Sequence, residues 1–307
     1  MVKRIIDLRF LRRSTKIGIS LMGLLLLFAA CVSKQQEEKV VSVTIEPQRY
    51  FAERIAGDRF TIHCVVPEGQ SPETYDPTPR QMVRIGQGQA YLRIGTIGFE
   101  LAWMDNIQAN NPEMRVFDLS EGIQPLKSPE EGGAHAHHTH SHSHGEMDPH
   151  IWNSIAGARL IAKNTRDAFM ALDPEGEDFY QANYEELMKE IRETEAAISS
   201  LLRPLRHKAF IIYHPALTYF AAEYGLTQLC IEIDGKEPSP AQLEELVRTA
   251  RAHDAKVVFI QQEFDQKNAE LIAEETGCRL VRINPLDYHW NAEMIHIAKA
   301  LADGEVD

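Results

Sequence analysis

The segment DPEGEDFYQANYEELMKEIRETEAAISSLLRP, residues 173–204, has the pattern of one long amphipathic helix. Asp173 suits the N-cap position and Pro174 the first helical position. Apolar side chains then recur every three or four residues, with Thr194 as the one polar interruption, at Tyr180, Tyr184, Leu187, Ile191, Ile198 and Leu201. Such a helix would be about 45 Å long at 1.5 Å per residue, enough to span two lobes. A long helix packed on one domain would show the same periodicity.

Strand-like and helix-like segments alternate on both sides of this helix. We expect strands at 41–47, 59–67, 89–95, 113–120, 208–215, 227–233, 255–262 and 278–285. Helical patterns occupy 77–88, 216–225, 239–254, 266–277 and 291–302. This alternation predicts an α/β fold with parallel sheets covered by helices.

The composition is that of a globular protein, with 44% hydrophobic and 25% charged residues. A length of 307 residues allows two lobes, each with its own core. The net charge of -13 argues against a nucleic-acid partner, because phosphate binding needs a basic surface.

The N-terminus has the features of an export signal. Basic residues up to Lys16 precede an apolar run at 17–30 that is too short for a comfortable membrane span. The sequence LFAAC, ending at Cys31, resembles the lipobox of bacterial lipoproteins, in which the cysteine is lipidated. We expect an extracytoplasmic protein held at a membrane surface by this lipid. An ordinary cleaved signal with a chance cysteine is the alternative.

Three further cysteines remain, at positions 64, 230 and 278. An oxidising compartment permits a disulfide, and Cys230 with Cys278 is the favoured pair because both lie near predicted strands of the second half. Free thiols explain the same sequence equally well.

A histidine-rich stretch lies within residues 121–149, which show no periodicity and form a long loop. Its six imidazoles belong to His135, His137, His138, His140, His142 and His144. We expect a weak metal-collecting or metal-sensing loop, and an inert solvated loop is the alternative.

Other candidate ligands follow predicted strands or turns. His214 ends the strand at 208–215, and Glu73 lies in the Pro- and Gly-rich loop 65–79. His150 follows an Asp-Pro turn, and the last strand is followed by Asn284, Asp287 and His289. Ligands of open α/β sheets gather at the carboxyl ends of strands, so together these groups suit a first-row divalent metal. Each one alone also fits ordinary structure.

Five motifs in one order resemble the zinc- and manganese-binding solute-binding proteins of bacterial ABC importers. They are PEGQSPETYDPTP, DPHIWNS, YHPALTYFAAEYGL, EIDGKEPSPAQLEELV and VFIQQEFDQKNAELIAEETG. The resemblance runs from about residue 41 to the end, and it implies two α/β lobes, one rigid linker helix and a metal site in the cleft between them. The implied parts are a signal peptide (1–30), a lipidated tether (31–40), an N-terminal lobe (41–172) with the histidine-rich loop (130–149), the linker (173–204) and a C-terminal lobe (205–307).

The resemblance also implies a ligand set. Its second and third ligands fall on His150 and His214. The first is a histidine in the family, and Glu73 stands there in this chain. The fourth is a carboxylate where this chain has Asn284, and we favour Asp287, three residues on, with His289 or water as alternatives.

Zinc is the expected metal. Zinc-type members of this family have histidine at the position of His214, and imidazole suits zinc better than manganese. Glu73 points weakly toward manganese, which remains the alternative. A histidine-rich loop at this position is similar to that of the zinc-type members.

The resemblance implies a monomeric binding protein that captures Zn²⁺ and delivers it to a membrane permease, without catalysis. A secreted zinc hydrolase is a second hypothesis, but HSHSHGEMDPH (140–150) does not form HxHxDH and the chain contains no HExxH. A metal-sensing surface lipoprotein or adhesin is a third.

Overall fold

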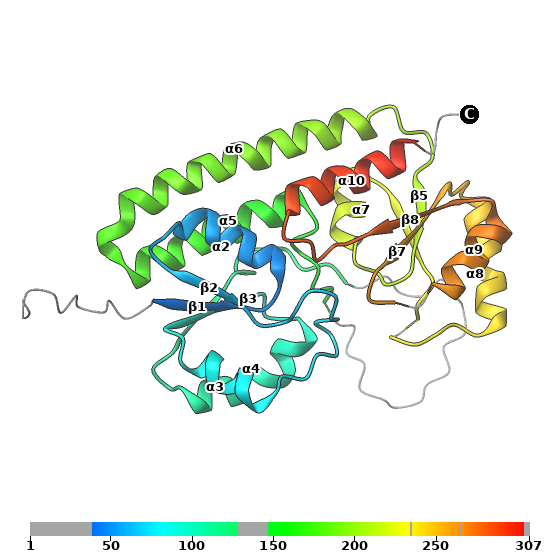
Figure 1. Ribbon diagram of the computed structural model, residues 1–307. Coiled ribbons are helices and arrows are strands. Elements are labelled where there is room, and N and C mark those ends of the chain that lie inside the picture. Colours follow the sequence, from blue (N-terminus) through cyan, green and yellow to red (C-terminus); the bar gives the residue numbers. More distant parts are fainter. Residues whose placement is uncertain (1–38, 128–146, 234, 265, 304–307) are drawn as a thin grey trace, which may run out of the picture. The chain divides into compact units, whose positions relative to one another are not determined.

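Two parallel β-sheets of four strands each form the framework of the computed structural model, which describes residues 39–127, 147–233, 235–264 and 266–303 (Figure 1). The first sheet has the order β2-β1-β3-β4 and contains β1 (Val40–Val43), β2 (Thr61–Cys64), β3 (Ala90–Arg93) and β4 (Arg115–Asp118). The second has the order β6-β5-β7-β8 and contains β5 (Ala209–Ile212), β6 (Thr227–Cys230), β7 (Val257–Gln261) and β8 (Arg279–Ile283). The predicted α/β class is confirmed.

The two sheets share one topology, although no repeat is evident in the sequence. In each, the second strand lies on one side of the first and the third strand on the other, so the strand order reverses there. A crevice at the carboxyl ends of the strands forms at such a reversal and commonly holds the ligand. The fold therefore offers two crevices that could contribute to one site.

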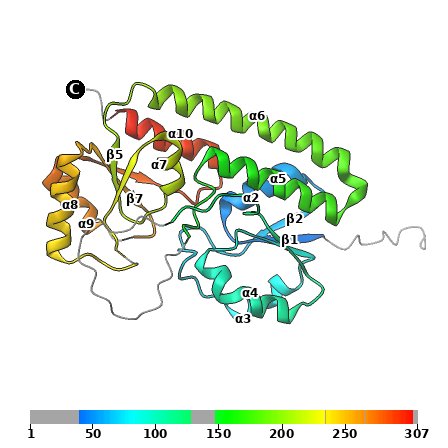
Figure 2. The ribbon, with the colours of Figure 1, turned by 180° about the vertical axis from the view of Figure 1, so that it is seen from behind.

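Helices cover the sheets on both faces (Figures 1 and 2). The first half contains α2 (Glu46–Ala56), α3 (Pro79–Gly86), α4 (Gly98–Asn110) and α5 (Ile155–Leu172). The second half contains α7 (Thr218–Tyr224), α8 (Pro240–Ala252), α9 (Lys267–Thr276) and α10 (Trp290–Ala302). Local sequence sets several of these ends: Thr78 Oγ1 accepts a hydrogen bond from Gln81 N at the start of α3, and Gly225 and Gly277 close α7 and α9 in the left-handed conformation.

The long helix predicted from residues 173–204 is α6 (Glu177–Leu202), preceded by a single 3-10 turn at Pro174–Gly176. Asp173 does not cap it, contrary to our expectation. Its carboxylate instead accepts hydrogen bonds from Arg59 Nε at 2.8 Å and from the Tyr180 hydroxyl at 2.6 Å. The Asp173 carboxylate bonds to these two side chains instead of capping the helix.

The predicted apolar stripe of α6 is largely buried, from Tyr180 to Ile198, and Leu202 rather than Leu201 closes it. Thr194 satisfies its hydroxyl by donating to Glu190 O at 2.9 Å. The helix packs against α5 and α2 of the first half and against α10 of the second. One helix is therefore buried along its length against both halves, as the linker helix was predicted to be.

One hydrophobic core continues from the first sheet across α6 to one face of the second sheet, where Phe210, Ile212 and Phe259 belong to it. A smaller core lies under α8 and α9 on the opposite face of that sheet. Because the larger core is shared, the two halves are not independent packing units.

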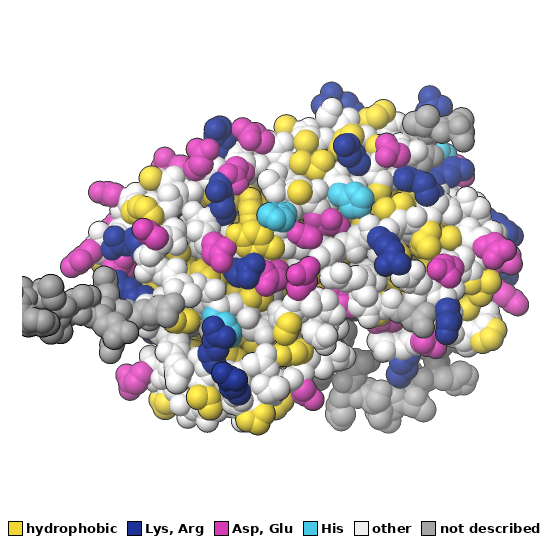
Figure 3. All heavy atoms as spheres, viewed as in Figure 1, with side chains coloured by type: hydrophobic (Ala, Val, Ile, Leu, Met, Phe, Trp, Pro, Cys, Tyr) yellow, Lys and Arg dark blue, Asp and Glu magenta, His cyan; other side chains and the backbone are white. Residues whose placement is uncertain are grey.

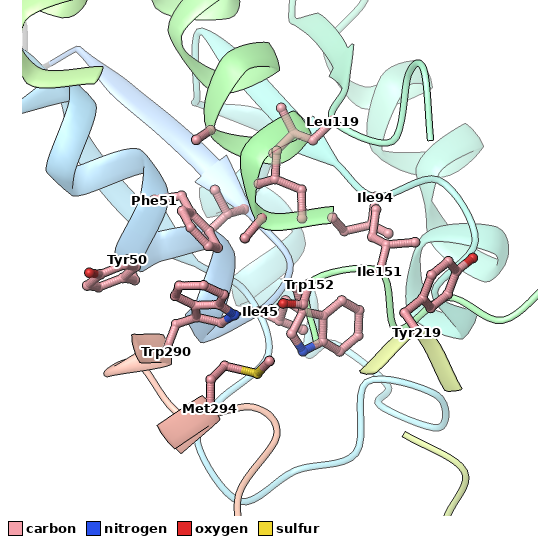
Figure 4. Packing of buried hydrophobic residues seen from close by; sticks show 14 of the residues in the cluster. Ile45, Tyr50, Phe51, Ile94, Leu119, Ile151, Trp152, Tyr219, Trp290 and Met294 are labelled. Carbon is pink, nitrogen blue, oxygen red and sulfur yellow. Dashed lines mark hydrogen bonds between the residues drawn. The ribbon is translucent and has the colours of Figure 1, made fainter. Parts of the chain in front are cut away.

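Two buried tryptophans form hydrogen bonds across the junction between the halves (Figure 4). Trp152 Nε1 donates to Pro285 O at 2.8 Å, and Trp290 Nε1 donates to the Trp152 carbonyl at 2.7 Å. The Tyr219 hydroxyl adds a hydrogen bond to Asp148 O at 3.0 Å. These bonds join the loop before α5, which carries His150, to the loop after β8 and to the starts of α10 and α7.

The predicted disulfide between Cys230 and Cys278 is wrong, because both thiols are free, as is that of Cys64. Cys230 ends β6 and Cys278 precedes β8, at opposite edges of the second sheet. Three strand spacings of about 4.8 Å separate these edges, roughly 14 Å, whereas a disulfide needs Cα atoms within about 7 Å.

The expected signal peptide, Cys31 and the six histidines at 135–144 lie outside the described residues. Within the ranges that are described, no helix combines the length and apolar character needed to cross a membrane. On the face shown in Figure 3, acidic and basic side chains are interspersed, without one continuous basic area.

Candidate metal site

One pocket brings together three of the predicted ligands, Glu73, His150 and His214. They come from loops after β2, β4 and β5, so both halves of the fold contribute. A fourth acid, Glu263, also lines this pocket, and Trp152 and Phe264 provide apolar walls. The pocket therefore lies where the carboxyl ends of the two sheets meet.

His150 is oriented by the acid two residues before it. Asp148 Oδ1 lies 2.9 Å from His150 Nδ1 and accepts a hydrogen bond from His150 N at 2.8 Å, and both residues are buried. Because a carboxylate only accepts, Nδ1 carries a hydrogen, and Nε2 presents a lone pair whenever the ring is neutral.

The charges of this pair shift both pKa values. Burial works against the imidazolium of His150, but the neighbouring Asp148 carboxylate outweighs it and raises the pKa of His150. Burial likewise works against the Asp148 carboxylate, but its charge interaction and hydrogen bonds with His150 lower the pKa of Asp148. The acid therefore remains ionised beside the ring, which is the state that orients a ligating imidazole.

His214 is held by three contacts of its own. Its Nδ1 lies 3.2 Å from Glu232 Oε2, which follows β6. Gln261, at the end of β7, grips the His214 backbone, because its Nε2 donates to His214 O at 2.8 Å and its Oε1 accepts from His214 N at 3.3 Å. The Phe264 ring stacks on the imidazole with centroids 5.2 Å apart. As in His150, the Nδ1 atom of His214 lies beside a carboxylate, and its Nε2 atom is on the opposite side of the ring.

The two free imidazole nitrogens face each other. His150 Nε2 and His214 Nε2 are 3.3 Å apart. Two nitrogen ligands of a tetrahedral zinc ion, each about 2.0–2.1 Å from the metal, lie about 3.3–3.4 Å apart. Two lone pairs at this distance repel each other unless a proton or a cation lies between them. The pair has the spacing of two zinc ligands.

Glu73 is held from one side only. Its Oε2 accepts a hydrogen bond from Gly98 N at 3.0 Å at the start of α4, whereas its Oε1 is buried and has no partner. Its charge is near enough to His150 to contribute to raising the pKa of that imidazole. One carboxylate oxygen at the pocket is therefore buried and unsatisfied.

The other predicted candidates lie outside the pocket wall. Asp287 Oδ2 accepts from Asn284 Nδ2 at 3.3 Å and its Oδ1 from His289 N at 2.7 Å, so these residues bond to one another. Pro285 and Leu286 line the pocket instead. Across the described part of the chain, no three His, Cys, Asp or Glu side chains stand close enough together to hold a metal as they are. The imidazole pair is in place, and the acids around it would have to turn inward.

Sequence reasoning missed Glu263, Glu232 and Gln261. Glu263 lies two residues after the end of β7 and directly after the strand predicted at 255–262, a position to which we had assigned no role. A search for acids at the carboxyl end of every predicted strand would have found both Glu232 and Glu263.

Comparison with known proteins places the chain in a family. The model of the family described as zinc-uptake complex component A, periplasmic, matches residues 41–304. The high-affinity zinc uptake system protein ZnuA of Bacillus subtilis (strain 168) is 28% identical over 251 residues, covering 80% of this chain and 78% of the relative. The manganese ABC transporter substrate-binding lipoprotein PsaA of Streptococcus pneumoniae is 27% identical over 270 residues, covering 84% and 83%.

A solved structure shows the same fold. The crystal structure of a zinc-bound ZnuA deletion mutant is 32% identical to this chain, with a TM-score of 0.79. The similarity covers 88% of this chain and 99% of that structure. The two-lobed α/β fold expected from the sequence is thereby confirmed.

Proposed function

Because the chain belongs to the family of the periplasmic zinc-uptake complex component A, we propose that it captures Zn²⁺ outside the cytoplasm and delivers it to the permease of an ABC importer. One observation carries this proposal: two imidazoles from different halves bring their Nε2 atoms to 3.3 Å from each other in a pocket. A binding protein needs such a preorganised ligand pair, and each ring is fixed by its own acid.

Zinc is the metal we propose, with manganese as the alternative. Two imidazoles favour zinc, while the carboxylate of Glu73 is a hard oxygen donor that suits manganese as well. The relatives include both zinc and manganese proteins, so the argument for zinc depends on the imidazole pair.

A transport role explains the site better than hydrolysis. A zinc hydrolase needs an open metal position and a base beside it. Asp148 and Glu232, which do not line the pocket, are each engaged with the Nδ1 atom of a histidine that does. Both acids therefore orient the imidazoles, and neither is placed to act as a base for hydrolysis.

The remaining features of the chain fit delivery at a membrane. We propose that Cys31 carries the lipid anchor, that residues 31–40 form the tether, and that the protein acts as a monomer at the outer face of the membrane. The histidines at 135–144 would then collect metal with low affinity. Matching relatives include lipoproteins, which supports the anchor.

The test is a zinc competition titration of residues 32–307, which omit the signal and Cys31, in a background that also lacks residues 135–144. The deletion removes weak binding and leaves one tight site. His214→Ala in this background should lower zinc affinity by at least about 100-fold, because one missing ligand exposes the metal to water. His289→Ala is the matched control, since its side chain is exposed and outside the pocket.

Two results would contradict the proposal. Retention of tight binding by His214→Ala would remove His214 from the site. Loss of tight binding on deletion of residues 135–144 alone would assign the tight site to that loop.

A further inference from the structure

Three ligands leave the proposed site one short. Glu73, His150 and His214 supply three donors, whereas a closed zinc site has four. A water molecule or a fourth side chain must complete the coordination of the cargo ion. The inference that follows rests on the proposed function and concerns which residue of this chain fills that position.

The loop after β8 has no free donor directed at the pocket. The Asn284 side chain accepts a hydrogen bond from Leu286 N at 3.2 Å through Oδ1 and donates to Asp287 through Nδ2. Asp287 holds the turn by accepting from His289 N. Both side chains are used locally, and moving either one would break the bonds that shape the loop.

Glu263, in contrast to Asn284 and Asp287, has a carboxylate oxygen without a hydrogen-bond partner. It lines the pocket, yet its Oε1 is buried and unpartnered. A buried carboxylate oxygen without a hydrogen bond costs free energy, and a cation in the pocket would offset that cost. Glu263 and His214 line the same pocket.

The backbone around Glu263 is fixed to the same histidine. Gln261, two residues before it, bonds to both backbone groups of His214, and Phe264, the next residue, stacks on its ring. Phe264 N also donates to Gln261 O at 3.3 Å, which closes a turn around Glu263. The backbone of Glu263 is therefore held between two residues that both contact His214.

We propose that Glu263 supplies the fourth metal ligand of this chain, in place of a side chain from the loop after β8. The two halves then contribute equally, with Glu73 and His150 from the first and His214 and Glu263 from the second. Two carboxylates balance the charge of a divalent ion, and two nitrogen with two oxygen donors form a harder site than imidazoles alone would give.

The test compares Glu263→Gln with Asp287→Asn, two isosteric changes that each remove one carboxylate. Zinc affinity is measured by chelator competition, and the visible absorption of Co²⁺ bound to each protein reports the coordination number. Glu263→Gln should lower zinc affinity by at least about 100-fold and convert the Co²⁺ spectrum from tetrahedral to a weaker, higher-coordinate form. Asp287→Asn should leave both measurements unchanged.

A metal-free thermal melt separates ligand loss from misfolding. Glu263 Oε1 makes no bond in the folded protein, so Glu263→Gln should melt at or above the temperature of the parent. Parental zinc binding by Glu263→Gln overturns the inference, whether or not Asp287→Asn is impaired. If the parent itself fails to bind zinc, the proposed function fails instead.

Discussion

The approach of Gly98 to Glu73 is the tightest packing constraint in the site. A Cβ on residue 98 would lie 2.6 Å from Glu73 O and 2.8 Å from Glu73 Oε2, so any other residue forces backbone apart. The absence of a side chain lets Gly98 N reach the carboxylate at the positive end of α4. One oxygen of Glu73 is thereby anchored and the other is left for the pocket.

Gly98→Ala should therefore displace Glu73 and weaken zinc binding. We expect a loss of about 1–3 kcal/mol in the free energy of unfolding of the metal-free protein, measured by urea denaturation, because the clash is with backbone. Gly86→Ala, at the end of α3, is the matched control, since an added Cβ there meets nothing within 4 Å. Equal zinc affinities for the two variants would show that the close approach does not position Glu73.

Glu100 holds the loop that precedes Gly98. Its buried carboxylate accepts hydrogen bonds from Ile94 N at 3.0 Å, Gly95 N at 2.5 Å and the Thr44 hydroxyl. Burial outweighs these hydrogen bonds and raises the pKa of Glu100 to about 7. The folded protein therefore keeps a proton that the unfolded chain releases near pH 4.5.

This shift predicts a pH dependence of stability. The contribution of Glu100 is fully present below its unfolded pKa of 4.5 and is lost as pH rises to its folded pKa of about 7. Unfolding free energies from urea titrations between about pH 5 and about pH 8 should fall in the parent relative to Glu100→Gln, which has no such proton to lose. Parallel curves for the two proteins would mean that Glu100 does not titrate in this range.

Candidate ligands could be predicted from the sequence where a short local motif identifies them. His150 lies in the motif DPH, and Asp148 in that motif also orients it. Glu232 orients His214 from 18 positions away, and that pairing exists only because β6 lies beside β5. Asp287 was favoured because the resemblance pointed to the last loop, and the hydrogen bonds that occupy Asp287 appear only in three dimensions.

At the scale of elements, α6 was the most predictable because its apolar side chains repeat over many turns. Its start was not, since Arg59 and Tyr180 occupy the carboxylate of Asp173 that could have capped it. The helices α2, α4 and α5 received no ranges of their own from the sequence. In α4 the buried Phe99, Met104 and Ile107 are interrupted by the strongly exposed Leu101, which blurs the stripe.

The strands are shorter than the apolar runs that predicted them. The run at 208–215 yields β5 (Ala209–Ile212), and the last residues of the run form the loop that carries His214. β-propensity continues past the end of the hydrogen-bonded ladder because the following residues also pack against the core, as Tyr213 does. The ends of such runs are where ligands are found, so overlong strand predictions hide site residues.

At the scale of the described chain, the candidate metal site depends on the packing of the two halves. His150 and His214 lie 3.3 Å apart and follow strands of different sheets, and the Trp152 and Trp290 bonds cross the junction between those sheets. Both indoles are almost fully buried in the shared core. The junction could not be predicted from local sequence, because each tryptophan bonds to a backbone carbonyl that is remote in sequence.

The shared core predicts that the metal-free protein unfolds in one cooperative transition despite its two sheets. Separating the halves would expose both tryptophans, one face of the second sheet and the buried stripe of α6, so neither half should remain folded alone. In Trp103→Phe the emission comes from Trp152 and Trp290 at the junction, whereas far-ultraviolet circular dichroism reports all helices. The two signals should have the same midpoint in urea. A fluorescence midpoint at clearly lower urea, with most helical signal retained, would show that the junction opens first and that the halves are separate folding units joined by α6.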